Sequence, residues 1–479
     1  PDAYLVSVGV GGLGLPDKDY YTNPDDRFVQ IRKAYVEHIA KMLGFAGVKD
    51  GQARAEAVLA LETALAAPQW ERAQRRDRDK TYNVTAFADL SKMYPGYDFA
   101  AHLKAQGVPL PDKVNVPTPS AVAPVLKVIN DTPLNVWRDY MTYWAVRGNA
   151  PFLSKQIDET AFAFTGTVLS GQTAQREPWK RAVGLVGGMQ GLGEAVGKVY
   201  VARHFSPESK KAMDELVENL RAALRQNIER LDWMGADTKA EAYKKLASFR
   251  PKVGYPTKWK DYSKLTIVPG DLMANMTALR QFAADDDNRR VGKKTDRDEW
   301  FMTPQTVNAY YNAQFNEIVF PAAILQAPFF DVNADPAVNY GGIGAVIGHE
   351  MGHGFDDQGS KSDWQGIQRN WWTDADRANF QKKVDMLGKQ FDAFCPLPNT
   401  CVNGKLTMGE NIGDLGGLSM AYTAYQLSLK GKPAPVIDGL TGDQRFFMGW
   451  AQVWKSKYRD EALVNLIKTN PHSPAMYRI

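Results

Sequence analysis

The sequence predicts a mainly α-helical protein with a small β component, divided into two units near residue 295. Three observations support this. Apolar residues recur at three- and four-residue steps over long segments, and one short run is β-prone. After residue 296 the pattern changes from amphipathic helices to a β-prone run followed by glycine-rich segments. With 479 residues, 44% of them hydrophobic, the chain can bury a sizeable core. We therefore expect a mostly helical unit over residues 1–295, with segments shared with the second unit, and that second unit over residues 296–479.

The first unit is predicted to consist of helices separated by breakers. Helical spacing of apolar residues is found in Asp25–Leu43, Gln52–Ala66 and Asn135–Trp144. The clearest helix follows Ser206, a favourable N-cap, with Pro207 at its first position, and it is expected to end at Gly235. Packing of an amphipathic face explains these segments without any role in a site.

The second unit is predicted to combine a short strand with helices rich in glycine. The β-prone run EIVF ends at Pro321, which favours a short edge strand. Helices are expected over Asn339–Asp356, Gly409–Leu427 and Gly442–Tyr458, the last with aromatic residues on its buried face. Each interior glycine costs a helix about 0.5–1 kcal/mol relative to alanine. Their recurrence therefore predicts close approach of the backbone around a site.

Charge and hydropathy argue against two kinds of partner. The net charge is +4 and no run of five or six like charges occurs, so nucleic acid and anionic membranes are not expected partners. No apolar stretch approaches the ~18 residues that span a bilayer. The first residues lack the basic start and apolar core of a signal peptide. A membrane anchor is expected only in a segment ahead of this chain.

The two cysteines, Cys395 and Cys401, lie close together in FCPLPNTC. This spacing suits a small disulfide-closed loop in an oxidising compartment. Two unrelated reduced thiols are the alternative, because sequence does not determine the Cα separation that a disulfide requires. Neither cysteine belongs to a CxxC motif, so redox catalysis is not expected.

The stretch VIGHEMGHGFDD places His349, Glu350 and His353 in one predicted helix. Residues i and i+4 share a helix face, so the two histidines can direct their imidazoles at one metal ion. Glu350 lies about 100° round the helix from His349, from where it can reach a water beside the metal. This HExxH arrangement is that of zinc metalloproteases, in which the glutamate is the general base. Two surface histidines on an ordinary helix are the alternative.

A third ligand is expected from Glu410 in LTMGENIGDLGGL. A catalytic zinc ion takes three protein ligands and keeps a fourth position open. Glu410, on a separate predicted helix, would complete such a set and hold one zinc ion per chain. Without the first motif, Glu410 would be explained equally well as a capping residue after Gly409.

Carboxylates near the ligands are candidates for orienting them. A liganding histidine usually donates its second ring N–H to a carboxylate, which determines the tautomer. Asp414, one turn after Glu410, can serve one histidine. Asp356, three residues after His353, can serve the other, and Asp357 is the alternative to Asp356.

Several longer stretches match, in order, the motifs of one known family. They are GLGLPDKDYY (12–21), LDWMGADTKAEAYKKL (231–246), VNAYYN (307–312), IVFPAAILQAPFF (318–330), NYGGIGAVIGHEMGHGFDDQG (339–359), GENIGDLGGL (409–418), FFMGWAQVW (446–454) and NPHSPAMYRI (470–479). Together they resemble the neprilysin and endothelin-converting-enzyme family of zinc metallopeptidases. The resemblance extends over essentially the whole chain.

The resemblance implies a zincin-like catalytic domain roofed by a larger helical domain. Such a roof excludes folded proteins, so the family resemblance implies an oligopeptidase that cleaves short peptides. The zinc ligands of the family match His349, His353 and Glu410, the catalytic base matches Glu350, and the carboxylate beside a ligand matches Asp414.

The resemblance also assigns residues that handle substrate. His472 matches a histidine that stabilises the tetrahedral intermediate, and Arg478 matches an arginine that binds substrate carbonyls. Asn308 and Ala309 match the pair that hydrogen-bonds the substrate main chain in the manner of an added strand. The walls of an apolar pocket for the residue after the scissile bond match Phe329, Val346, Val453 and Trp454, for which core packing is the alternative explanation.

The sequence also departs from the family pattern. Relatives carry a long segment ahead of the first residue here and continue past the position of Ile479. Lys455 stands where animal relatives have a cysteine, and their dense set of disulfides is missing. The missing cysteines favour a bacterial enzyme that is periplasmic or secreted, with a cytoplasmic location as the alternative. A monomer is expected. Two rival functions are a non-catalytic relative that binds peptides and a metal hydrolase acting on non-peptide bonds.

Overall fold

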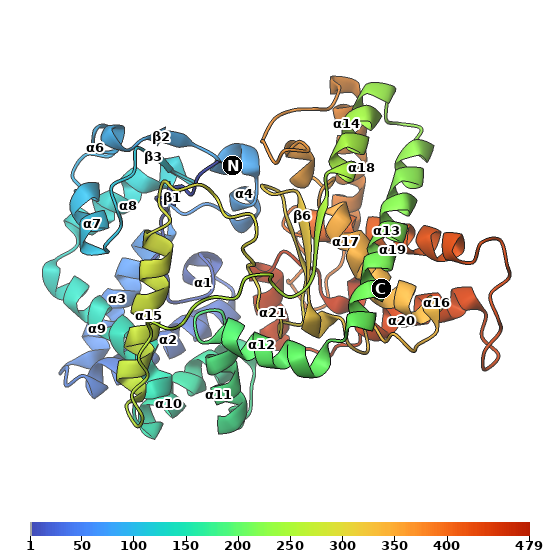
Figure 1. Cartoon of the computed structure of the whole chain (residues 1–479). Coiled ribbons are helices and arrows are strands. Elements are labelled where there is room, and N and C mark those ends of the chain that lie inside the picture. The colour runs from blue at the N-terminus through green and yellow to red at the C-terminus, as the bar shows by residue number, and fades with distance from the viewer. Residues whose placement is uncertain (1) are drawn as a thin grey trace.

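The computed structural model describes residues 2–479 and is mainly α-helical, as predicted (Figure 1). The helices before residue 206 are α1 (Asp19–Thr22), α2 (Asp26–Phe45), α3 (Gly51–Ala66), α4 (Arg72–Arg75), α5 (Arg78–Thr81), α6 (Leu90–Met93), α7 (Phe99–Ala105), α8 (Pro119–Asp131), α9 (Leu134–Asn149), α10 (Lys155–Phe162), α11 (Pro178–Gly187) and α12 (Gly193–His204). The three helices predicted here from periodicity correspond to α2, α3 and α9.

The later helices include those that carry the candidate site. They are α13 (Pro207–Arg230), α14 (Ala236–Ala247), α15 (Leu272–Asn288), α16 (Pro336–Asn339), α17 (Ala345–Gly352), α18 (Asp374–Asp392), α19 (Met408–Ser428), α20 (Gly442–Val453) and α21 (Asp460–Thr469). The Ser206 hydroxyl caps α13 as predicted, accepting a hydrogen bond from the Ser209 amide at 3.1 Å. The predicted stop was wrong, because α13 ends at Arg230 and Gly235 precedes the next helix, where its amide donates to Asp376.

Two small sheets make up the β component of residues 2–479. One contains β1 (Val6–Ser7), β3 (Lys113–Asn115) and β2 (Val84–Ala86), in that order, and the other contains β4 (Arg250–Gly254), β6 (Glu317–Pro321) and β5 (Tyr310–Asn312). The predicted edge position of β6 was wrong. β6 is the central, fully buried strand, parallel to β4 and antiparallel to β5. Pro321 is compatible with a central strand because it is the last residue, where its missing N–H interrupts no continuing ladder.

Two large hydrophobic cores organise the chain. The N-terminal core gathers buried residues between Leu15 and Leu169, mainly from α2, α3 and α9, together with Val464 of α21. The C-terminal core runs from Phe205 to Trp450 and contains α13, α17, α19 and β6. In Figure 1 the two groups of helices lie side by side, with α15 on the N-terminal side of the junction and α12 beneath the junction, where its Tyr200 and Val201 pack against the C-terminal core. α13, α14 and β4 precede residue 295 in the sequence but contribute residues to the C-terminal core. The division at residue 295 stays a prediction.

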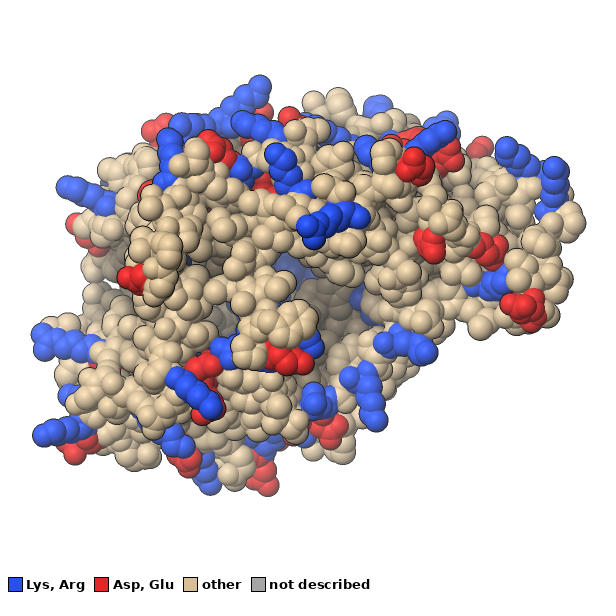
Figure 2. All heavy atoms as spheres, turned by 60° about the horizontal axis from the view of Figure 1, so that its bottom comes forward, with Lys and Arg blue, Asp and Glu red and all other residues tan. Residues whose placement is uncertain are grey.

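The space-filling view shows one face hollowed near its middle (Figure 2). On that face Lys and Arg side chains are interspersed with Asp and Glu. Over residues 2–479, none of the helices combines the length and the apolar content that crossing a bilayer requires.

Candidate metal centre and active site

The helix that carries the HExxH motif is short, buried and irregular at its start. α16 leads into a π-helical turn, Tyr340–Gly344, which α17 continues. Such π-turns inside α-helices are frequent at functional sites. His349 and Glu350 are 7% and 6% exposed, so both polar side chains are held inside the protein.

Glycines bring α17 into direct backbone contact with α19. A Cβ atom at Gly348 would lie 2.5 Å from the carbonyl oxygen of Gly417, and a Cβ at Gly417 would collide with the backbone of His349. A larger residue at either position would push the helices apart. The close approach that the glycine pattern predicts is therefore found at the crossing that places Glu410 opposite the two histidines.

Three side chains from the two helices converge on one point. The candidate ligand atoms of His349, His353 and Glu410 all lie within 4.8 Å of one another. His349 Nε2 lies 3.1 Å from Glu410 Oε2, and His353 Nε2 lies 3.6 Å from the same oxygen. Two ligands of a tetrahedral zinc ion, each ~2.0–2.1 Å from the metal, are ~3.3 Å apart. The nitrogen and oxygen donors therefore fit zinc in both type and spacing.

Each histidine is oriented by a carboxylate at its other ring nitrogen. His349 Nδ1 lies 2.9 Å from Asp414 Oδ1, and His353 Nδ1 lies 2.8 Å from Asp356 Oδ2. Both contacts leave Nε2 directed at the metal position. Of the two adjacent aspartates, Asp356 contacts His353, whereas Asp357 accepts hydrogen bonds from Arg76.

The electrostatics of the site follow from burial and from these contacts. Burial acts to lower the pKa of His349, but its contacts with Asp414 and Glu410 outweigh burial and raise the pKa to about 9. Burial acts to raise the pKa of Glu410, yet the contacts with the neighbouring histidines bring it well below its usual range. For Glu350 burial prevails and the pKa is raised. Glu410 is thus ionised, the form in which a carboxylate binds a metal ion, and Glu350 is a stronger base than an exposed glutamate.

Two residues near the C-terminus complete the site. His472 Nε2 lies 3.0 Å from Glu410 Oε2, while its Nδ1 lies 2.8 Å from Asn470 Oδ1. Arg478 donates two hydrogen bonds to Asp414, at 2.6 and 2.8 Å, and stacks on Trp454 with its Cζ 3.8 Å from the ring centroid. Arg478 is thereby linked through one carboxylate to His349, a candidate metal ligand.

A cavity of about 480 Å³ opens beside the metal position. Its walls include most of the predicted substrate residues, namely Asn308, Ala309, Phe329, Val346, Trp454 and Arg478. Val453 differs, since it packs against the C-terminal core outside the lining of this cavity. The reason is helical geometry, because neighbouring residues of a helix lie about 100° apart and Trp454 takes the inward direction.

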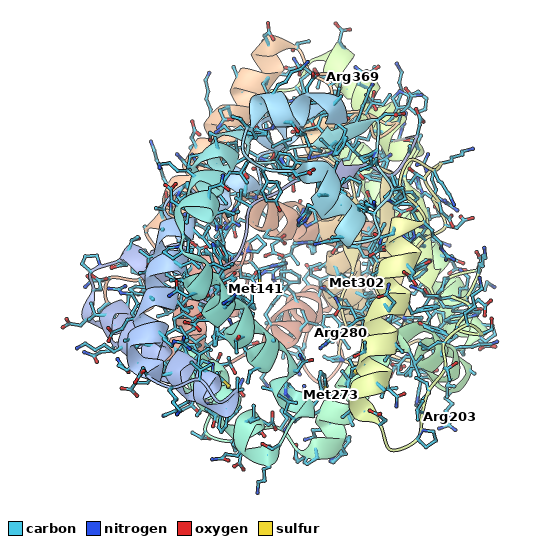
Figure 3. All side chains as sticks on the ribbon, turned by 90° about the vertical axis from the view of Figure 1, so that its left-hand side faces the viewer. Met141, Arg203, Met273, Arg280, Met302 and Arg369 are labelled. Carbon is cyan, nitrogen blue, oxygen red and sulfur yellow. A yellow bond between two sulfur atoms is a disulfide. The ribbon has the colours of Figure 1, made fainter. Side chains whose placement is uncertain are left out.

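The cavity also contains residues that sequence reasoning missed. They are Met302, Val307, Tyr310, Tyr311, Ile324 and Trp450. The segment VNAYYN carries three of them. Two of these, Tyr310 and Tyr311, lie in β5, whose antiparallel pairing with the buried β6 only the structure shows. Figure 3 shows Met302 and, from α9, Met141 on opposite sides of the opening seen from the N-terminal half.

The two cysteines form the predicted disulfide, Cys395–Cys401. It closes the loop between α18 and α19. Phe394, next to it, stacks on Tyr477 with ring centroids 4.5 Å apart, and Tyr477 precedes Arg478. The disulfide loop therefore supports the C-terminal segment that reaches the site.

A helix bearing HExxH, with a glutamate from a second helix, is the ligand arrangement that defines one class of zinc metallopeptidases. Sequence comparison is more specific. Two models of peptidase family M13 match residues 1–256 and 308–479, and the chain belongs to that family. The predicted resemblance is confirmed.

Individual relatives agree with this assignment. The chain is 31% identical to Neprilysin-3 of Drosophila melanogaster, covering 99% of this chain and 63% of the relative. It is 33% identical to Endothelin-converting enzyme 1 of Rattus norvegicus, covering 99% and 64%. The crystal structure of zinc metalloprotease Zmp1 from Mycobacterium tuberculosis, in complex with inhibitor, superposes with a TM-score of 0.95 at 46% identity, covering 100% and 73%. The chain spans less than two thirds of the length of the two curated relatives.

Proposed function

We propose that this chain carries the active site of a zinc-dependent endopeptidase that hydrolyses short peptides on the amino side of hydrophobic residues. The observation that carries the proposal is the convergence of His349, His353 and Glu410, with the buried Glu350 next to His349 on α17 and His353 directly after that helix. Membership of peptidase family M13 supports peptides as the substrate class. All catalytic positions are present, which favours a peptidase over a non-catalytic relative that binds peptides.

The residues divide the chemical work. When bound, zinc supplies a Lewis acid that polarises the scissile carbonyl and makes a nearby water more acidic. Glu350 accepts the proton of the attacking water and returns it to the leaving amine. His472, held by Asn470 with Nε2 toward the site, donates to the developing oxyanion. A donor of this kind contributes about 10²–10³-fold to turnover.

The cavity walls account for substrate placement. Asn308 and Ala309 precede β5 and offer main-chain and amide groups to an extended peptide. Phe329, Val346 and Trp454 form an apolar wall that suits a large hydrophobic side chain after the scissile bond. This placement of peptide groups is also the reason to prefer a peptide bond over the non-peptide substrates of other metal hydrolases.

Compartment and assembly are proposed on two further observations. The disulfide Cys395–Cys401 favours a periplasmic or secreted location over the cytoplasm, because exposed disulfides persist in oxidising compartments. One zinc ion per chain is proposed because a single chain supplies all three ligands. The site so formed needs no second copy, which is what a monomer requires.

Incubation with a peptide library, followed by mass spectrometry of the products, tests the proposal. We expect cleavage of short peptides before large hydrophobic residues, loss of cleavage with a chelator and recovery with added zinc. Glu350→Gln protein prepared in parallel serves as the control for contaminating peptidases. Zinc-loaded protein that leaves every library peptide intact would show the proposal to be wrong.

A further inference from the structure

A segment from the N-terminal half of the chain, residues 71–81, lies against the loop that follows the HExxH helix. The segment contains the short helices α4 and α5. Glu71 and Gln74 form a reciprocal cap on α4, and the Asp77 carboxylate accepts from the Asp79 amide to begin α5. Figure 1 shows α4 at the junction between the two groups of helices.

The segment is fixed at its N-terminal side by the GLGLPDKDYY motif. Arg72 and Arg75 both contact the buried carboxylate of Asp17, at 2.5 and 3.4 Å. Lys18 binds Glu71 at 3.0 Å and also donates to the carbonyl oxygen of Gln69. The 71–81 segment is therefore anchored to the N-terminal core before it reaches the metal centre.

On its other side the segment contacts residues 356–368. The Arg78 guanidinium donates to the Ser362 hydroxyl at 2.7 Å, and the Arg78 amide donates to Gln358 at 3.0 Å. Lys361 binds Asp79 at 2.7 Å, and the amide side chain of Gln368 donates to the Arg78 carbonyl at 3.1 Å. These contacts hold the loop whose first residue is Asp356, the carboxylate that orients His353.

Arg76 has the central position among these contacts. Its guanidinium makes two hydrogen bonds to Asp357, one of them at 3.2 Å, and a third to the carbonyl oxygen of Lys405 at 3.4 Å. Asp357 follows the carboxylate that orients His353, and Lys405 lies shortly before Glu410. One side chain thus binds both segments that carry ligands.

Gly409 shows how closely these groups fit. A Cβ atom at Gly409 would collide with an Nη atom of Arg76 and would lie 2.8 Å from Asp356 Oδ2 and 3.2 Å from Asp357 Oδ1. The arginine and the two carboxylates therefore occupy the space beside the residue that precedes Glu410. Displacement of Arg76 would leave the start of α19 without its packing partner.

The loop is held from its other face by a buried lysine. The Lys245 ammonium donates to the carbonyl oxygens of Gly359 and Ser362, at 2.7 and 2.6 Å, and is only 1% exposed. Asp356 in turn accepts from the amides of Gln358 and Gly359. With Lys245 on one face and the 71–81 segment on the other, the position of Asp356 depends on parts of the chain far from it in sequence.

We propose that Arg76 is a positioning residue for the metal centre, holding the loop of Asp356 and the start of α19 so that His353 and Glu410 meet. The inference rests on the proposed zinc site and adds a determinant of its geometry from the N-terminal half. Arg76 acts through Asp357 and the backbone and does not contact the metal position. A planar guanidinium suits this position better than a lysine, because a point charge restores the charge but not the paired hydrogen bonds.

Zinc affinity measured by chelator competition tests the inference, together with the visible spectrum of the Co²⁺-substituted protein and the thermal unfolding of the zinc-depleted protein. We expect Arg76→Met to weaken zinc binding about 10–100-fold and to alter the Co²⁺ spectrum. Loss of a residue that orients the metal ligands without binding the metal typically has an effect of this size. Arg76→Lys should recover part of the affinity. Lys80→Met, on the same segment and 56% exposed as a side chain, is the matched control and should bind zinc like the unaltered protein.

Asp357→Asn extends the test. It should weaken zinc binding as Arg76→Met does, and the double variant should lose little more, because the two residues act as one unit. Affinity and Co²⁺ spectrum unchanged in Arg76→Met would overturn the inference, as would a loss of affinity that only follows a fall in the unfolding temperature of the zinc-depleted protein. Failure of the unaltered protein to bind zinc would instead overturn the proposed function.

Discussion

Buried histidines occur in both halves of the molecule, and their pKa values are shifted in opposite directions. His38 of α2 is 3% exposed in the N-terminal core, stacks on Phe164 at a centroid distance of 4.8 Å, and has no hydrogen-bond partner for either ring nitrogen among the described residues. Burial lowers its pKa to about 3. His349, 7% exposed in the C-terminal core, has a pKa raised to about 9. Burial acts in the same direction on both, so the neighbours decide the sign.

Buried glutamates repeat the contrast. Glu62 in the N-terminal core accepts hydrogen bonds from the Tyr21 and Tyr35 hydroxyls and the Gly14 amide, all neutral donors, and burial raises its pKa. Glu410 faces histidines instead, and its pKa is lowered. Burial alone therefore does not indicate a metal site. What distinguishes the C-terminal core is that buried acids and bases are arranged against one another.

The largest expected effect comes from replacing a buried glutamate of the candidate site, Glu350, and comparing it with Glu62, a buried glutamate of the N-terminal core. Glu350→Gln removes the base while keeping the shape of the side chain, so we expect kcat to fall about 10²–10⁴-fold with zinc still bound. Glu62→Gln is the matched control in the N-terminal core, where kcat should change little. Steady-state kinetics and zinc content per chain measure both. Near-normal turnover of Glu350→Gln would contradict the assignment of the base.

A smaller effect is expected when the carboxylate behind a ligand loses its charge. Asp414→Asn weakens the hydrogen bond to His349 and removes the charge that binds Arg478, so zinc affinity should fall about 10–100-fold. Chelator competition measures the change. Asp139→Asn, a buried aspartate paired with Arg54 in the N-terminal half, is the control. Equal affinities in the two variants would mean that Asp414 does not tune the ligand.

The smallest effect concerns the acid sensitivity that His38 confers. Above its ordinary pKa of 6.5, His38 is neutral in the folded and unfolded chain alike. Below that value the unfolded chain takes up a proton that the folded core accepts only near pH 3, so stability falls as pH decreases through this window. Each pH unit costs at most about 1.4 kcal/mol.

His38→Phe should remove this dependence. Between about pH 7.5 and about pH 5.5, the variant should lose ~1 kcal/mol less unfolding free energy than the unaltered protein in urea titrations. His102→Gln, at an exposed histidine that contacts Tyr97, is the control variant. A parallel loss of stability in His38→Phe and the unaltered protein would mean that other groups set the acid sensitivity.

Much of the fold and of the site could be predicted from the sequence. The two wrong predictions about the fold concern the position of one strand and the end of one helix. Periodicity identified α2, α3 and α9, and the N-cap Ser206 marked the start of α13. The edge position assigned to β6 failed because a proline at the end of a strand does not reveal which strands flank it. The stop at Gly235 failed because glycine also precedes helices, as it does before α14.

The sequence by itself determined the local chemistry, because an i, i+4 pair on a helix shares one face whatever surrounds it. His349, Glu350 and His353 were therefore readable from spacing. Only the tertiary structure decided that Glu410 reaches them, through the contact of Gly348 with Gly417, and that Asp356 rather than Asp357 orients His353. Those choices depend on atoms far apart in the chain, whose approach is set by packing and by charges such as Arg76 that no local pattern encodes.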